Sequence, residues 1–181
     1  MIIESKEFIL DNDNILFRSP NKDDWEALIK LLKTVYQETR FLAKEASEIN
    51  ISEKAEKAFI ERINKSDNSY MVLAFVNGEL AGMASIEGGN TIRSAHRANV
   101  GIALKQSFTN RHIGTLLFDY LLENCKYTSL EQLELSVVKK NVHAYHLYLK
   151  SGFVCYGVLD RAMKYPDGTY DDEYQMIKKL K

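Results

Sequence analysis

The stretch from Ala98 to Val137, ANVGIALKQSFTNRHIGTLLFDYLLENCKYTSLEQLELSV, decides the fold. Residues 98–104 alternate between bulky and small side chains, as β-strands do. Residues 113–126 carry apolar side chains at helical spacing, and residues 133–137 are typical of a short buried strand. A strand, helix and strand of these lengths imply parallel strands joined by a right-handed crossover. The sequence therefore predicts a parallel strand pair.

One side of the predicted strand 98–104 is almost bare of bulk. That side carries only Asn99, Gly101 and Ala103, whereas the bulky residues lie on the opposite side. Such small side chains let another backbone, or a thin ligand, lie close against the strand.

The rest of the chain alternates between helical and strand patterns. Asn21 is expected to cap a helix that ends near Glu38, and Ser52 a second helix that ends near Lys65, with an irregular segment at 39–51 between them. The remaining elements are a strand at 15–18, a hairpin of strands 70–76 and 79–87 joined by Asn77-Gly78, a helix at 141–151 stopped by Gly152, and a hairpin of strands 153–163 and 170–177 joined by Pro166-Asp167-Gly168.

This order, β-α-α-β-β-β-α-β-α-β-β, predicts an α/β (α+β) fold with a mixed sheet and helices on its faces. The 181 residues fit one core, so we expect a single domain over residues 1–181. Because folds of this kind host many chemistries, the order alone names no function.

Charge and hydropathy exclude several classes of partner. A formal net charge of −1 gives no overall positive field, so we expect no nucleic-acid partner. No apolar run approaches the ~20 residues that cross a bilayer, and the N-terminus does not resemble a targeting segment; we expect a cytoplasmic protein with no membrane partner. Cys125 and Cys155 lack neighbouring ligands at metal-binding spacing, so we expect no metal. A nucleophilic cysteine would need a base such as His143 or His146, supplied by the fold.

A polar segment between strand 98–104 and helix 113–126 is the first candidate site. It reads Leu104-Lys-Gln-Ser-Phe-Thr109-Asn110-Arg111-His112-Ile113-Gly114-Thr115. Unpaired N–H groups at a helix N-terminus can hold a phosphate or pyrophosphate, and Gly114 permits close approach. Arg111 and Lys105 can add charge-assisted contacts. Taken alone, the segment is more often an ordinary polar loop that enters a helix.

A second motif follows this loop: Asn141-Val-His-Ala144-Tyr-His-Leu147-Tyr148-Leu-Lys-Ser-Gly152-Phe153. Together the two segments resemble the GNAT N-acetyltransferases, and the resemblance extends over nearly the whole chain. It implies a mostly antiparallel twisted sheet with helices on both faces and a splayed central parallel strand pair. It also implies transfer of an acetyl group from acetyl-CoA to a primary amine by direct attack in a ternary complex.

The resemblance assigns the cofactor-binding residues. It implies that the diphosphate of acetyl-CoA lies on residues 109–115 and that the pantetheine arm pairs with main-chain groups of the strand end, whose residues are Ile102, Ala103 and Leu104. Asn141 is expected to contact the pantetheine arm from the same helix as Ala144. Within the loop, Leu104 and Gly114 match the family pattern, whereas Thr109 and His112 depart from it.

The resemblance makes Tyr148, on the face shared with Ala144 and Leu147, the proton donor to the departing thiolate. Taken alone, such a tyrosine is more often a packed core residue. The amine needs a base, for which Glu87 and His96 are the favoured candidates and Ser85 a further one.

The segments Ile92–Ala98 and Tyr170–Met176 resemble those of GNAT enzymes that act on small, amino-acid-like molecules. We therefore expect a small amine acceptor. A protein or peptide N-terminal or lysine acetyltransferase and a non-catalytic acyl-CoA-binding protein are the alternatives. Residues 39–51 and 153–177 are expected to shape the acceptor pocket, where several carboxylates can attract a cationic amine: Glu38, Glu45, Glu48, Asp160 and Asp172. A homodimer formed through the last strands is also possible.

Overall fold

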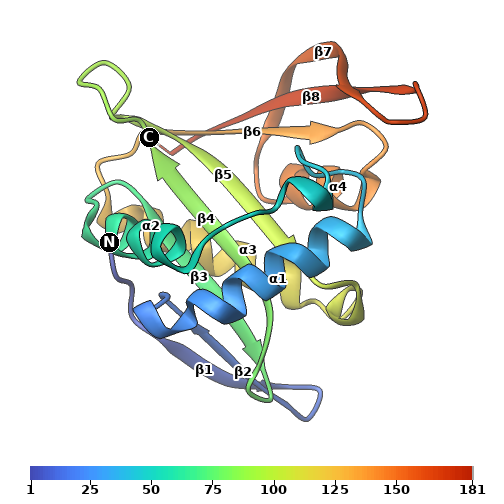
Figure 1. Ribbon diagram of the computed structural model, residues 1–181. Coiled ribbons are helices and arrows are strands. Elements are labelled where there is room, and N and C mark those ends of the chain that lie inside the picture. Colours follow the sequence, from blue (N-terminus) through green and yellow to red (C-terminus); the bar gives the residue numbers. More distant parts are fainter. Residues whose placement is uncertain (181) are drawn as a thin grey trace. The chain divides into compact units, whose positions relative to one another are not determined.

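The computed structural model describes residues 1–180, which form two compact units (Figure 1). The first unit contains residues 1–87 and 101–129, and the second contains residues 88–100 and, within the described part, 130–180. The central strand β5, Arg97–Leu104, begins in the second unit and ends in the first.

The first unit is built on an antiparallel meander of β1 (Lys6–Leu10), β2 (Asp13–Arg18), β3 (Tyr70–Val76) and β4 (Glu79–Gly88). The predicted hairpin at Asn77-Gly78 is present, and both of its turn residues have positive φ. The sequence pattern did not predict β1, and β2 begins two residues before the strand predicted at 15–18. The β1–β2 turn is formed by Asp11 and Asn12, whose φ angles of 49° and 72° are those of a tight hairpin turn.

Helices cover both sides of this meander. In Figure 1, α1 (Trp25–Glu38) and α2 (Glu53–Lys65) lie in front of β3 and β4, whereas α3 (Ile113–Glu123) lies behind. The core between α1, α2 and the strands consists of apolar side chains that are almost fully buried: Leu28, Leu31, Val35, Ile60, Ile63, Met71, Leu73 and Leu80.

The ends of these helices follow the caps predicted from the sequence. Asn21 accepts the Asp23 N–H and forms a capping box with Asp24 at the short helix η1 (Lys22–Asp24), which leads into α1. Ser52 accepts the Ala55 N–H at the start of α2. The segment between α1 and α2 is irregular except for the short helix η2 (Ala46–Glu48). Two further short helices, η3 (Gln106–Phe108) and η4 (Asn124–Tyr127), flank α3.

The second unit contains β6 (Gln132–Val138), α4 (Val142–Lys150), β7 (Val154–Lys164) and β8 (Tyr170–Lys179). Its strand order is β5-β6-β8-β7, with β8 antiparallel to both neighbours. β5 and β6 are parallel, as the sequence predicted, with Arg97 aligned with Gln132 and Asn99 with Glu134. The bonds from Arg97 Nη1 to the Glu134 carboxylate, at 2.9 and 3.0 Å, stabilise this register.

Residues 1–180 therefore form a mixed α/β structure of eight mostly antiparallel strands that include one parallel pair. The predicted fold class is confirmed, with β1 as the one additional strand. No helix among residues 1–180 has both the length and the apolar character that a membrane crossing requires.

Candidate active site

The predicted diphosphate loop lies in the first unit, between β5 and α3. It begins with η3, in which Phe108 is buried and Gln106 is exposed. Thr109 donates its N–H and its hydroxyl to the Gln106 carbonyl oxygen, at 3.1 and 2.8 Å. Asn110 and His112 then both adopt left-handed backbone conformations, with φ of 59° and 60°. Residues in alternating backbone conformations of this kind turn their N–H groups toward a concave, anion-binding surface.

The N-terminus of α3 completes this surface. His112 is the N-cap, and its side chain makes no capping hydrogen bond. The first helical bond joins the Leu116 N–H to the His112 carbonyl at 3.0 Å, so the N–H groups of Ile113, Gly114 and Thr115 precede the helical ladder. A Cβ on Gly114 would meet only Leu104 Cδ2, at 3.7 Å. The loop and the start of α3 therefore have the kind of backbone that binds anions, which is what the predicted diphosphate site requires.

The cationic side chains of the loop are engaged by carboxylates. Lys105 Nζ lies 2.7 Å from Glu79 Oε1 on β4, and Arg111 forms an ion pair with Asp13 of β2. The Arg111 guanidinium also lies over the Phe108 ring, 5.4 Å from its centroid. Both cations that the sequence offered to a phosphate are therefore paired within the first unit, and a phosphate would have to compete with Asp13 for Arg111.

The C-terminal half of β5 leads directly into this loop. Its parallel register with β6 covers only Arg97–Asn99, and β5 continues as a strand to Leu104. The half-buried residues Ile102, Ala103 and Leu104 form this end of the strand, as predicted. Gly82 on β4, which no sequence motif singled out, also shapes this region. A Cβ there would lie 2.6 Å from the Ala103 carbonyl oxygen, so only glycine allows β4 to approach β5 this closely.

The second motif forms α4 in the second unit. Asn141 is its N-cap and accepts the Ala144 N–H at 3.3 Å, so this asparagine has a structural role whether or not it also contacts a ligand. The helix stops at Gly152, whose φ is +86°. The Tyr148 side chain is almost fully buried, with its ring centroid 6.0 Å from that of Phe153. Burial raises the pKa of Tyr148 to about 12, so the phenol stays protonated at neutral pH.

The two favoured base candidates lie in different units. Glu87, in the first unit, is exposed and lies 3.3 Å from Arg62 Nη2. His96, in the second, is exposed, and its carbonyl oxygen accepts the Glu131 N–H at 2.7 Å. Ser85 is buried, and its Oγ lies 3.6 Å from the position of a Cβ on Gly101.

One of the acidic residues expected to attract an amine is engaged elsewhere. Asp172 on β8 accepts the Arg161 N–H at 3.0 Å and a bond from Lys139 Nζ at 3.2 Å, and these bonds lower the pKa of its carboxyl group. Arg161 lies in the bulge of β7 and has a φ of 50°. Asp172 therefore stabilises the bulge.

The cysteines contribute no recognisable site. Cys125 is buried, with its Sγ 3.4 Å from the Tyr70 hydroxyl, and Cys155 is exposed. Among residues 1–180, no group of three or more His, Cys, Asp or Glu residues is arranged to hold a metal ion.

Comparison with known proteins identifies the family. The sequence profile of the Acetyltransferase (GNAT) family matches residues 25–153, which is more than half of the chain. The chain belongs to the GNAT acetyltransferase family. A solved GNAT acetyltransferase from Streptococcus pneumoniae is 30% identical and superposes with a TM-score of 0.89, covering 92% of this chain and 99% of that one.

Two further relatives cover most of both chains. The L-amino acid N-acetyltransferase AaaT of Escherichia coli K12 is 25% identical over 169 residues, which are 91% of this chain and 97% of AaaT. The yncA protein of Salmonella typhimurium, solved with its cofactor acetyl-CoA, shares the fold with a TM-score of 0.82 at 14% identity, over 93% of this chain and 95% of that one. The GNAT chain described here is an acyl-CoA-dependent N-acetyltransferase.

Proposed function

We propose that this GNAT enzyme transfers the acetyl group of acetyl-CoA to the primary amine of a small, amino-acid-like acceptor. The observation that carries the acceptor class is the match to an L-amino acid N-acetyltransferase over nearly the full length of both chains. The family profile matches residues 25–153, which include parts of both compact units, and this supports treating the two units as one functional domain.

The loop at the start of α3 is the proposed site of the acetyl-CoA diphosphate. N–H groups of residues 113–115, outside the helical ladder, and the positive end of the helix dipole favour an anion there. The pantetheine arm is proposed to pair with the main chain of β5 at residues 102–104, as an added strand would. At Gly101 an added Cβ would meet only Ser85 Oγ, at 3.6 Å, so the strand is uncrowded at this position.

The chemistry is direct attack of the neutral amine on the thioester carbon. A C–N bond forms, the C–S bond breaks, and the electron pair leaves on sulfur. We propose that the Tyr148 phenol donates to this sulfur and that Glu87 or His96, directly or through water, takes the proton from the amine. The phenol suits this role because burial keeps it protonated across the physiological pH range.

The test is acetyl-CoA-dependent thiol release over a panel of free L-amino acids, their D-enantiomers, polyamines, aminoglycosides and N-terminal peptides, with acetyl-CoA affinity measured by calorimetry in parallel. Release confined to L-amino acids, at least tenfold above the other classes, is the expected result. Release only with peptides would replace the small acceptor by a protein one. Tight acetyl-CoA binding without release from any acceptor would favour the non-catalytic alternative.

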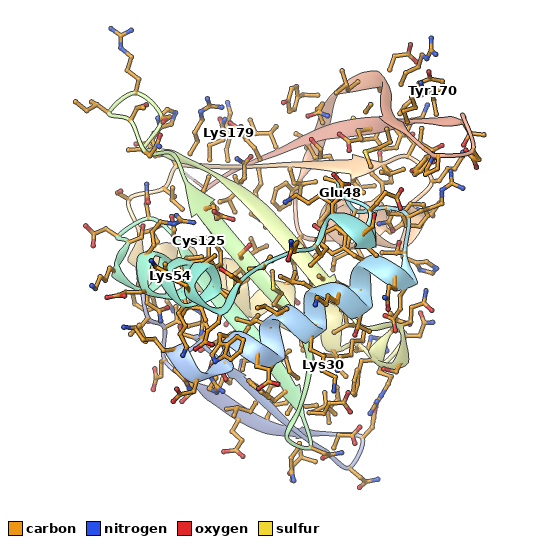
Figure 2. The ribbon with its side chains drawn as sticks, viewed as in Figure 1. Lys30, Glu48, Lys54, Cys125, Tyr170 and Lys179 are labelled. Atoms are coloured by element: carbon orange, nitrogen blue, oxygen red, sulfur yellow. The ribbon has the colours of Figure 1, made fainter. Side chains whose placement is uncertain are left out.

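We also propose a homodimer formed through β7. This strand ends the sheet order in the described chain and exposes four large apolar side chains by more than half: Val154 (59%), Tyr156 (64%), Val158 (53%) and Leu159 (53%). A two-fold axis would place β7 antiparallel to its own copy, so that the same apolar residues meet. At the far end of the hairpin, Tyr170 projects outward under the Arg161 guanidinium (Figure 2) and would lie outside such a contact.

A further inference from the structure

Two hydrogen bonds connect the end of α1 to the entrance of the diphosphate loop. The Gln106 N–H donates to Glu38 Oε2 at 2.8 Å, and Gln106 Nε2 donates to the Glu38 carbonyl oxygen at 2.5 Å. The two residues are 68 positions apart in the sequence, and both belong to the first unit. This paired contact between Glu38 and Gln106 is called the Glu38 clamp below.

Glu38 occupies a position that its own helix disfavours. It is the last residue of α1, where the helix dipole is negative, and the last turn of α1 carries no basic side chain to offset its charge. The carbonyl groups at such a helix end also lack intrahelical partners. Gln106 donates one hydrogen bond to the Glu38 carboxylate and one to the Glu38 carbonyl oxygen. These two bonds offset the unfavourable position of a negative charge at the end of α1.

The clamp lies directly ahead of the loop proposed to bind the diphosphate. The Gln106 carbonyl oxygen accepts both hydrogen bonds of Thr109, after which Asn110 and His112 take up their left-handed conformations. Glu38 thus fixes Gln106, and Gln106 in turn fixes Thr109. Lys105, bonded to Ala81 and Glu79, holds the other side of the same turn.

On its other side, the clamp borders the segment expected to shape the acceptor pocket. Residues 39–51 begin immediately after Glu38, where Thr39 Oγ1 accepts the Phe41 N–H at 3.1 Å. The segment is next held by the short helix η2, where Glu48 and Glu45 form a capping box; Glu48 lies there in Figure 2. One residue therefore joins the start of this segment to the start of the diphosphate loop.

We propose that Glu38 is a positioning residue for acyl-CoA and that, through it, acyl-CoA binding orders the acceptor segment 39–51. This inference rests on the proposed function, in that residues 109–115 receive the diphosphate. Glu38 touches neither substrate. It acts through Gln106, whose position sets the geometry of the N–H groups that follow.

The test uses the full chain and four variants. Glu38→Ala removes the carboxylate, Glu38→Gln keeps an oxygen that can accept the Gln106 N–H, and Gln106→Ala removes the side-chain half of the clamp. Glu26→Ala, an exposed glutamate at the opposite end of α1, is the matched control. Acetyl-CoA affinity is measured by calorimetry, and amide hydrogen exchange of residues 39–51 is followed with and without acetyl-CoA.

We expect Glu38→Ala to weaken acetyl-CoA binding about tenfold, the effect of losing one charge-assisted hydrogen bond. Glu38→Gln should recover most of this loss, and Glu26→Ala should match the wild type. Acetyl-CoA should protect residues 39–51 from exchange in the wild type, and this protection should fall at least threefold in Glu38→Ala while the melting temperature of the free protein changes little. Gln106→Ala should reproduce part of both effects.

Each outcome decides a separate claim. A wild type that does not bind acetyl-CoA overturns the proposed function, and the inference with it. A wild type that binds, together with a Glu38→Ala variant of unchanged affinity and unchanged protection of residues 39–51, overturns the role of Glu38 alone. Lost affinity that Glu38→Gln does not restore, accompanied by a lowered melting temperature, would reduce Glu38 to a purely structural residue and likewise overturn the inference.

Discussion

Replacing Tyr148 by phenylalanine removes one oxygen atom and preserves the ring. The ring packs in the second unit, 6.0 Å from Phe153 between centroids, and phenylalanine can fill the same space. The change therefore separates the chemistry of the phenol from the packing of α4. We expect acetyl-CoA binding to be retained and kcat to fall.

The size of the fall follows from the environment of the phenol. Burial raises the pKa of Tyr148 to about 12, which is about 3.5 units above the ~8.5 of an ordinary thiol. Complete proton transfer to a thiolate is therefore uphill, and the main effect is a hydrogen bond to the developing negative charge on sulfur. Hydrogen bonds to charged groups contribute about 1.5–3 kcal/mol, so we expect kcat to fall about 10- to 150-fold.

The assay is thiol release at saturating acetyl-CoA with the best acceptor from the panel. Tyr127→Phe is the matched control, because Tyr127 is 66% exposed in η4 and has no proposed role in the reaction. An unchanged kcat in Tyr148→Phe would remove Tyr148 as the donor. A fall of more than about a thousandfold would contradict the claim that the phenol acts mainly by a hydrogen bond to sulfur, since it would require proton transfer in the transition state.

The same substitution tests the pKa itself through protein stability. The folded-state pKa of Tyr148 is raised above its unfolded value of about 10. The contribution of the protonated phenol to the free energy of unfolding is therefore fully present below pH ~10 and is lost as the pH rises toward 12. For a shift of two units, the wild type should lose about 1.3 kcal/mol between pH 9 and 11 relative to Tyr148→Phe, measured by urea unfolding. Parallel stability curves for the two proteins would contradict the raised pKa.

Substitutions at three further positions test the loop and the edge strand. Gly114→Trp should abolish acetyl-CoA binding in calorimetry, whereas Gly114→Ala should still bind, because its Cβ would meet only Leu104 Cδ2 at 3.7 Å; equal affinities would place the diphosphate elsewhere. His112→Gly should tighten acetyl-CoA binding several-fold, and weaker binding would instead make the imidazole a ligand contact. The free energy of unfolding should change by less than about 1 kcal/mol, because glycine relieves the Cβ strain at a φ of 60° but gives the unfolded chain more conformational entropy. Tyr156→Lys should convert the proposed dimer to a monomer in sedimentation without loss of folding, and an unaltered mass would move the interface away from β7.

Most elements could be predicted because their signals are local. The caps at Asn21 and Ser52 and the turn at Asn77-Gly78 depend only on residues next to them in the sequence, and all three are present. The missed strand β1 offers only two alternating apolar residues, Phe8 and Leu10, and the intervening Ile9 is 74% exposed. The clearer local signal was Asp11-Asn12, a residue pair that tolerates the positive φ angles of a tight turn.

The same distinction between signals from neighbouring residues and contacts from distant ones applies to the proposed site. The elements that carry the proposed site, namely the end of β5, the loop and the helix with Tyr148, could be predicted from spacing because each is a continuous segment, and the resemblance to the GNAT family assigned their roles. The electrostatic partners of the loop could not, because they come from distant parts of the chain: Asp13, Glu38 and Glu79, which lie 98, 68 and 26 positions from their partners. A sequence pattern therefore identified Arg111 and Lys105 as available cations, whereas the fold pairs both with carboxylates.

These pairings explain how the loop can depart from the family pattern at Thr109 and His112. The proposed diphosphate ligands are backbone N–H groups, so the side chains in the loop need only permit the right backbone. His112 reaches the left-handed conformation that glycine adopts more readily, and Thr109 uses its hydroxyl to tie the loop to Gln106. The geometry that glycine would supply through conformational freedom is here enforced by contacts from α1, β2 and β4. A loop held this way should lose affinity when a contact such as the Glu38 clamp is removed, even though the contact lies outside the site.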